Sequence, residues 1–109
     1  MAVLNQVGLD EIHPNTTPVG FTLPEHPTSG ETLRPRRALI HVLDNPVRWR
    51  ADGTNPSATS GDVVAADTYI DWTGHGEEYH DAFSLIKRVK FVADASAAGA
   101  ATVICVFFG

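Results

Sequence analysis

The residues best suited to chemistry lie in one short stretch, 74–81, which reads GHGEEYHD. His75, Glu78 and His80 carry the nitrogen and oxygen atoms that divalent metals bind. Their spacing, however, is neither the i, i+4 pair of a helical zinc site nor a pair on one strand completed by a second strand. Two glycines among acidic residues are more typical of a surface loop. The sequence therefore predicts no metal site.

Three other features that could carry chemistry also favour structural interpretations. Asp52 opens a turn with Gly53, but the further acidic positions of a calcium loop are absent. The loop 54–61 is followed by a predicted strand, whereas a phosphate cradle needs a helix after its glycines. Cys105 lies in an apolar run and is interpreted as a buried small hydrophobe. We therefore expect no catalytic residue and no cofactor.

The net charge of the chain limits the kinds of partner that we expect it to bind. The 109 residues carry eight Lys and Arg against thirteen Asp and Glu, which gives a net charge of −5. Nucleic-acid binding favours a basic face, so no nucleic-acid partner is expected. No apolar run approaches the roughly 20 residues of a membrane-spanning helix. The N-terminus lacks a basic segment followed by an apolar one, so no membrane partner is expected either.

The stretch 45–56, NPVRWRADGTNP, carries the clearest strand and turn pattern. Side chains change face at every residue of a strand, so Trp49 and Ala51 share one face and Arg48 and Arg50 the other. A Trp buries about 200 Å² in a defined pocket, so we expect Trp49 to point inward as a core anchor. The two arginines then form a basic stripe that is either solvated or paired with acids of a neighbouring chain.

Two further strands are expected on either side of this stretch. The run 38–43 is apolar at almost every position, as in a strand that is covered on both faces or lies at an interface. His41, its polar exception, is interpreted as a core or edge residue and not as a ligand. Residues 62–72 read as one strand, or as two short strands broken near 66–67, with Trp72 inward and Tyr69 outward.

The last third of the chain supplies the remaining expected strands. Residues 81–86 could form a helical turn before a strand that ends at Val92. The run 101–108 is apolar on both faces, so it must lie inside a sheet or be covered by another subunit. The expected core anchors of the whole chain are Trp49, Trp72, Phe91 and Phe107.

The first part of the chain, 1–34, reads as an extended arm. Its four prolines remove backbone donors and favour extended geometry, so at most one short edge strand, near 19–23, is expected. Its apolar residues would be costly to leave in water, and we expect them to dock on a neighbouring subunit. The alternative is a free tail or one that folds over its own core. The residues concerned are Val3, Leu4, Val7, Leu9 and Ile12.

Short strands separated by turn signals, with no sustained helical period, predict an all-β fold. The expected architecture is a small antiparallel β-sandwich of jelly-roll type, or a barrel, formed by residues 35–109 and preceded by the 1–34 arm. A mixed α+β fold is the alternative. A core of this size is marginal by itself, so we expect a homo-oligomer.

The segment Val47-Arg48-Trp49-Arg50, followed by an Asp-Gly-Thr turn and Pro56, resembles a segment of small virion proteins encoded by tailed bacteriophages. In those proteins the segment leads into a Gly-opened strand, here after Gly61. A Phe-containing strand, here 89–92, then pairs with a closing strand, here 103–108. The resemblance covers residues 38–108 and implies a structural component of the virion with no catalytic residues.

The motifs do not distinguish a capsid position from one in the neck or tail, and our leading hypothesis is a homo-oligomeric capsid decoration or cement protein that binds the major capsid protein in the virion. Arg48, Arg50 and the arm would form its contacts, and a homotrimer would suit a local three-fold position. A neck or tail component is one alternative.

Two alternatives come from other classes of protein. A glycan-binding β-sandwich module would use Trp49, Tyr69 or Trp72 as a stacking platform. A metal-dependent enzyme of the double-stranded β-helix type would have to bring four ligands together, namely His41, His75, Glu78 and His80.

Overall fold

The computed structural model describes residues 6–26, 28–73 and 82–109. Within these residues the chain forms seven strands and one short helix. In chain order they are β1 (Gln6–Ile12), β2 (Arg37–Leu43), β3 (Val47–Arg50), β4 (Asp62–Val64), β5 (Thr68–Thr73), α1 (Ala82–Arg88), β6 (Lys90–Ala93) and β7 (Thr102–Phe108). Every pairing between these strands is antiparallel. The predicted all-β class is confirmed.

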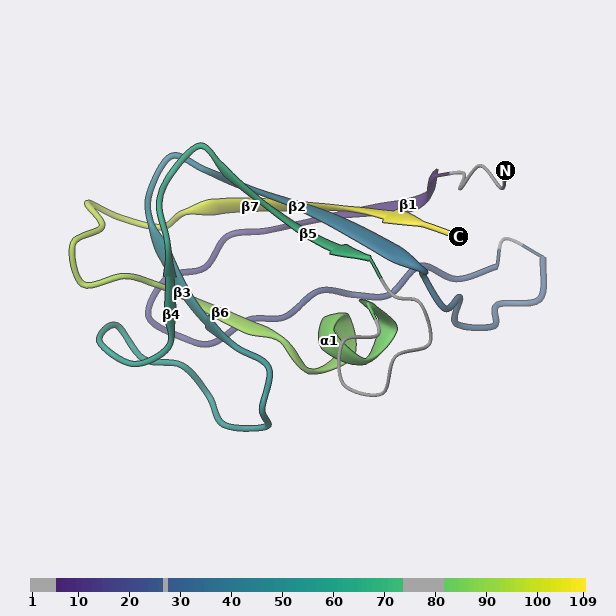
Figure 1. Ribbon diagram of the computed structural model, residues 1–109, viewed down its shortest axis with the longest axis horizontal. Helices are drawn as coiled ribbons and strands as arrows, with labels where there is room; N and C mark the ends of the chain where they lie inside the picture. Colours follow the sequence, from purple (N-terminus) through teal and green to yellow (C-terminus); the bar gives the residue numbers. More distant parts are fainter. Residues whose placement is uncertain (1–5, 27, 74–81) are drawn as a thin grey trace.

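The strands form two sheets. A four-stranded sheet has the order β1-β7-β2-β5, and a three-stranded sheet has the order β4-β3-β6. Figure 1 shows the four-stranded sheet along one side of the molecule, with the smaller sheet and α1 on the other side. Of the two positions expected for the apolar run 101–108, the first is correct, because β7 lies inside the sheet between β1 and β2.

The two central strands of the larger sheet bury only one face. Burial alternates along β2 and along β7, so that every second side chain is fully covered and its neighbours remain partly exposed. The inward residues are Ala38, Ile40 and Val42 from β2, and Val103, Cys105 and Phe107 from β7. β2 is therefore not covered on both faces by the described part of the chain.

The core forms between the two sheets around aromatic side chains. Phe91 of β6 and Phe107 of β7 are fully buried. The ring of Phe21 meets both of them edge to face, at centroid distances of 5.4 Å and 6.4 Å. Ile86 of α1 and Val47 of β3 close the core from the side of the smaller sheet. Trp49 and Trp72, the other two expected anchors, pack against this cluster but remain partly exposed.

The described part of the arm folds over the chain's own core. β1 pairs along β7, Ile12 is buried, and Val7 packs against the core cluster. This pairing satisfies the backbone groups of β1, which gives residues 6–12 a partner within the chain. Leu9 faces outward and is 57% exposed. Val3 and Leu4 lie outside the described residues.

The segment near 19–23, where at most one short edge strand is expected, forms no regular strand. Val19 makes only an isolated bridge, in which its N–H donates to the carbonyl oxygen of Phe91 at 3.0 Å and its own carbonyl oxygen accepts at 2.8 Å. The regular strand of this region is β1, which ends at Ile12, before the first proline. Prolines at 14, 18 and 24 remove ladder donors from the segment that follows. Carbonyl oxygens of this segment still accept hydrogen bonds from later residues, for example at Pro14 and Asn15.

The interruption expected near 66–67 is confirmed. β4 and β5 are separate strands that belong to different sheets. Between them Asp67 has a positive φ of 59°, and its N–H donates to the carbonyl oxygen of Val42 at 2.7 Å. The predicted faces of β5 are also correct, since Ile70 packs against the core while Tyr69 is 59% exposed.

Two adjacent phenylalanines of β7 provide a test of this architecture. Phe107→Ala is expected to lower the free energy of unfolding by about 3–5 kcal/mol, because it leaves a cavity at the centre of the core. Phe108→Ala is expected to cost clearly less, because Phe108 lies on the partly exposed face. Urea denaturation followed by circular dichroism measures both losses. Equal losses would contradict the assigned register of β7.

Candidate functional site

The basic stripe of β3 is paired within the chain. Nε of Arg48 donates to Oδ1 of Asp94 at 2.6 Å, and Nη1 donates to the carbonyl oxygen of Gly61 at 3.0 Å. Nη2 of Arg50 donates to Oδ2 of Asp52 at 2.5 Å. These pairs within the chain were not predicted from the sequence, which for Arg48 and Arg50 indicated only solvation or contact with a neighbouring chain. Each guanidinium has an acid of its own chain within reach, supplied by connections at both ends of the smaller sheet.

Asp94 is the less exposed of these two acids, with a side chain 10% exposed against 54% for Asp52. Ser96 donates to its Oδ2 from both the hydroxyl and the backbone N–H, at 2.5 Å and 3.0 Å, and Arg48 donates to Oδ1. These bonds, those of Ser96 first, lower the pKa of Asp94 from 3.8 to about 2. The backbone N–H of Asp94 also donates to the carbonyl oxygen of Pro46 at 3.1 Å. The connection after β6 is thereby fixed to the start of β3.

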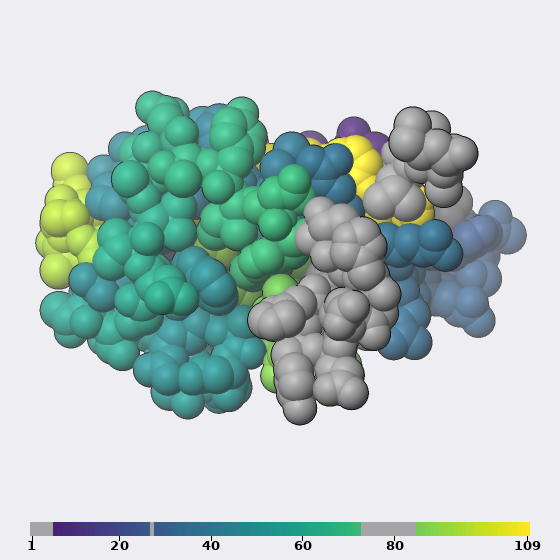
Figure 2. All heavy atoms as spheres, in the orientation of Figure 1, coloured from purple at the N-terminus to yellow at the C-terminus, as the bar shows by residue number. Residues whose placement is uncertain are grey.

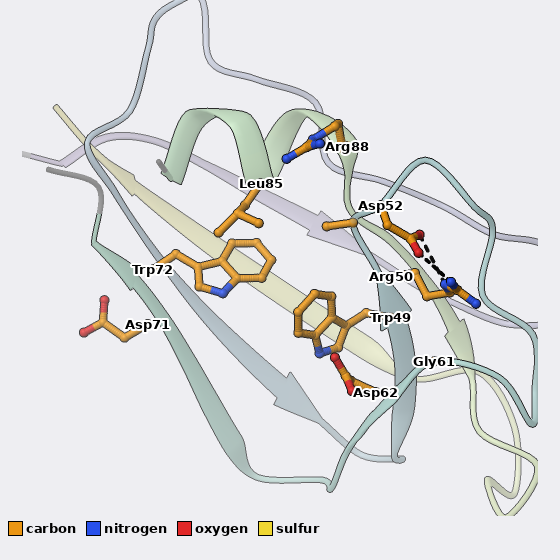
Figure 3. A pocket seen from close by; sticks show the side chains of 10 residues that line it. Trp49, Arg50, Asp52, Gly61, Asp62, Asp71, Trp72, Leu85 and Arg88 are labelled. Atoms are coloured by element: carbon orange, nitrogen blue, oxygen red, sulfur yellow. Dashed lines mark hydrogen bonds and ion pairs between the residues drawn. The ribbon is translucent and has the colours of Figure 1, made fainter. Parts of the chain in front are cut away.

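An open pocket of about 750 Å³ lies beside this stripe, between β3 and β5. Figure 2 shows this face of the molecule, where teal residues of the smaller sheet and its loops meet the green residues of β5. In Figure 3 the indoles of Trp49 and Trp72 lie next to each other, with Leu85 of α1 above them. The residues that line the pocket are Trp49, Arg50, Ala51, Asp52, Gly61, Asp62, Asp71, Trp72, Leu85 and Arg88.

The two tryptophans form the apolar part of the pocket. Their ring centroids are 5.3 Å apart and the planes meet at 69°, an edge-to-face arrangement. Each indole packs on the core with one part and remains partly exposed with another. Neither indole N–H donates a hydrogen bond within the described part of the chain, and neither is sealed from solvent. The pocket therefore combines an aromatic surface with two available donors.

Gly61 shapes the same pocket from the loop side. Its φ of 127° is in a region that side-chain-bearing residues rarely adopt. A Cβ atom at this position would lie 2.9 Å from the carbonyl oxygen of Trp49. Glycine is therefore needed for the close approach that lets its carbonyl oxygen accept from Arg48.

A second candidate site is the outer face of the four-stranded sheet. We use this name for the apolar outward side chains of its four strands, which share this side of the sheet with Glu11, Arg37, His41, Asp71 and Thr102. The apolar members are Leu9, Leu39, Leu43, Tyr69, Ile104, Val106 and Phe108. The pairing register places Leu9, Val106 and Leu39 in one row across three strands. Leu9 is 57% exposed and Tyr69 is 59% exposed. Figure 1 shows no described element over this side of the sheet.

Charged and aromatic groups border the outer face. Arg37 holds Asp71 through two hydrogen bonds of 3.0 Å and 2.9 Å, and its guanidinium carbon lies 5.2 Å from the ring centroid of Phe108. His41 stacks on Tyr69 with centroids 4.1 Å apart and planes at 9°. His41 is thus an outward residue of the sheet, in contact with the neighbouring strand.

The remaining sequence candidates do not form a site in the described part of the chain. His75, Glu78 and His80 lie outside the described residues. Among residues 6–26, 28–73 and 82–109, no group of three or more His, Cys, Asp or Glu side chains could hold a metal ion. Cys105 is fully buried, and its burial raises the pKa of the thiol to about 12. Its interpretation as a small core hydrophobe is confirmed.

Comparisons with known proteins add no relative. The sequence matches no protein-family model, and neither the curated proteins nor the solved structures contain a match to it. No described helix has the length and apolar character that crossing a membrane would require. The two surfaces described above are therefore the structural features from which a function can be inferred.

The hydrogen bonds to Asp94 predict an acid-dependent loss of stability. With its pKa lowered from 3.8 to about 2 in the folded state, the contribution of Asp94 is complete above pH 3.8 and is lost as the pH falls to about 2. Asp94→Asn should therefore lower the free energy of unfolding at neutral pH and have little effect near pH 2. Urea denaturation of both proteins across this range measures the difference.

Ser96→Ala is the matched variant for this measurement. Because it removes the hydroxyl that donates to Asp94, the folded-state pKa of the carboxyl should rise toward 3.8. The acid-dependent loss of stability should then be smaller and should be complete at a higher pH than in the parent protein. An Asp94→Asn effect of the same size at neutral and acidic pH would contradict the assignment.

Proposed function

We propose that this chain is a structural protein of a tailed-bacteriophage virion, a decoration protein that stabilises the head by binding the major capsid subunits. The proposal joins the resemblance of residues 38–108 to one structural observation, the apolar outer face of the four-stranded sheet. Neither Arg48 nor Arg50 serves as a contact residue in it, because both are paired within the chain.

The outer face has the composition of a contact surface. Its centre is the apolar row of Leu9, Val106 and Leu39, with Ile104 on the next row. Contiguous apolar surface on a soluble protein marks an interaction site more often than single exposed apolar residues do. Polar pairs lie at its border, such as Arg37 with Asp71, and Glu11 with His13, in which Oε2 and Nε2 are 3.0 Å apart. An apolar centre with a polar rim is the usual anatomy of a protein interface.

We assign this face to contact between copies of the chain, in a homo-oligomer that we expect to be a trimer. Around a three-fold axis each sheet would contact two neighbouring copies, and the alternating exposed residues of β2 and β7 present side chains that can interdigitate with theirs. Covering it would add apolar burial to a small core that is marginal by itself. Oligomer and fold would then stabilise each other.

The outer face provides a direct test of the oligomer. Leu9→Lys is expected to convert the oligomer to monomer, because it places a charge at the exposed end of the apolar row that the contact would bury. Val63→Lys on β4 is the matched control, since Val63 is 53% exposed but belongs to the other sheet. Size-exclusion chromatography with light scattering gives the masses. A monomeric parent protein, or an oligomer unaffected by Leu9→Lys, would contradict the assignment.

The virion role is tested on particles. Virions that lack this protein should lose infectivity faster on heating or at low salt than complete virions, because the decoration protein bridges capsid subunits. Adding the purified protein back should restore the resistance, and the Leu9→Lys variant should restore less. Particles with unchanged resistance would overturn the decoration role, and finding the protein only at the neck or tail would favour that alternative.

A further inference from the structure

We propose that the pocket between Trp49 and Trp72 is a carbohydrate-binding site. This inference concerns the inner side of β5 and stands independently of the oligomer contact on the outer face. It is drawn from the shape, the aromatic surface, the free donors and the charge balance of the pocket.

The shape and size of the pocket suit a small ligand. Its volume of about 750 Å³ falls within the range of small-molecule sites, roughly 300–1,000 Å³. Trp49 stands on β3, which is paired on both sides by β4 and β6, and Trp72 stands on β5, which is paired with β2. Both platforms are therefore held by strand ladders, so a ligand would meet a largely preformed surface.

The two indole surfaces favour a ligand whose ring has an apolar face. Indoles at 69° to each other cannot close into a parallel stack, and both remain partly exposed. A sugar ring offers a face of C–H groups that packs on an indole, while its hydroxyls point outward around the rim. The two indole N–H groups, which donate to no described residue, are placed to meet hydroxyl or ring oxygen atoms.

The rim supplies groups that bind hydroxyls. Asp62 is exposed and lies beside Trp49 in Figure 3. Its carboxylate oxygens accept hydrogen bonds, and the guanidinium of Arg50 donates them. A few polar groups around an apolar surface are the arrangement that fixes the orientation of a ligand in a pocket.

The charge balance favours a neutral ligand. Two arginines and three aspartates line the pocket, and two of these aspartates are already paired, Asp52 with Arg50 and Asp71 with Arg37. An organic cation would bind the aromatic pair through its charge, but it would also approach the guanidinium of Arg50. An anion would approach Asp52 and Asp62. A polyhydroxylated neutral ring avoids both conflicts.

The experiment measures glycan binding by the full chain on a broad array of bacterial and animal glycans, followed by titration of the tightest-binding glycan. Trp72→Ala is expected to weaken binding at least about tenfold. Trp72→Phe should lose less, because it keeps a smaller ring for stacking. Circular dichroism and thermal melting establish that each variant is folded, and Trp72→Phe carries the test if Trp72→Ala does not fold.

Tyr69→Ala is the matched control. Tyr69 is the other exposed aromatic residue of β5, three residues from Trp72 and on the opposite face, so its loss should leave glycan affinity unchanged. Leu9→Lys should also leave it unchanged, which separates a failure of this site from a failure of the oligomer contact.

Three results would overturn the proposal. The first is that the parent protein binds no glycan on the array. The second is that glycan binding survives Trp72→Ala and Trp72→Phe at full strength. The third is that tetramethylammonium, titrated by tryptophan fluorescence, binds and loses its affinity in Asp62→Asn, which would assign the pocket to organic cations.

Discussion

The rest of the structure depends on the insertion of β7 between β1 and β2. This position gives the strand two ladders, which satisfy its backbone on both sides and join the first described segment of the chain to the last. It also directs Val103, Cys105 and Phe107 into the core, where Phe107 meets the ring of Phe21. The outward residues of the same strand form the middle of the outer face. Core and contact surface are thus two sides of one alternating pattern.

Local alternation predicted the strands and their faces well, because it depends only on the period of an extended chain. The inward position of Trp49, the outward position of Tyr69 and the break before Thr68 follow from it. The pairing of distant segments did not follow. β1 forms its strand by hydrogen bonding to β7, which is distant in sequence. Arg48 is likewise paired with Asp94, which lies 46 residues further along the chain. No local pattern encodes such a partner.

The pocket shows the same limit. The sequence places Trp49 and Trp72 inward, but it does not show that the two indoles meet, because they stand on strands of different sheets. Both indoles pack against the edge of the core and remain partly exposed to solvent. Since Trp72 and Tyr69 point to opposite sides of β5, the pocket and the outer face can each be occupied without excluding the other. One strand therefore serves two surfaces.

The order of the strands in the larger sheet also has a consequence for biosynthesis. β2 and β5 can pair as soon as both have left the ribosome, but β1 has no ladder partner until β7 is made, more than ninety residues later. During that interval the apolar side chains of β1 and β2 lack β7 as a packing partner and remain more exposed to solvent. Contacts so distant in sequence slow folding, and exposed strand edges favour association of incomplete chains. Because the larger sheet is complete only when β7 pairs with β1 and β2, the nascent protein is prone to aggregation until β7 has been made.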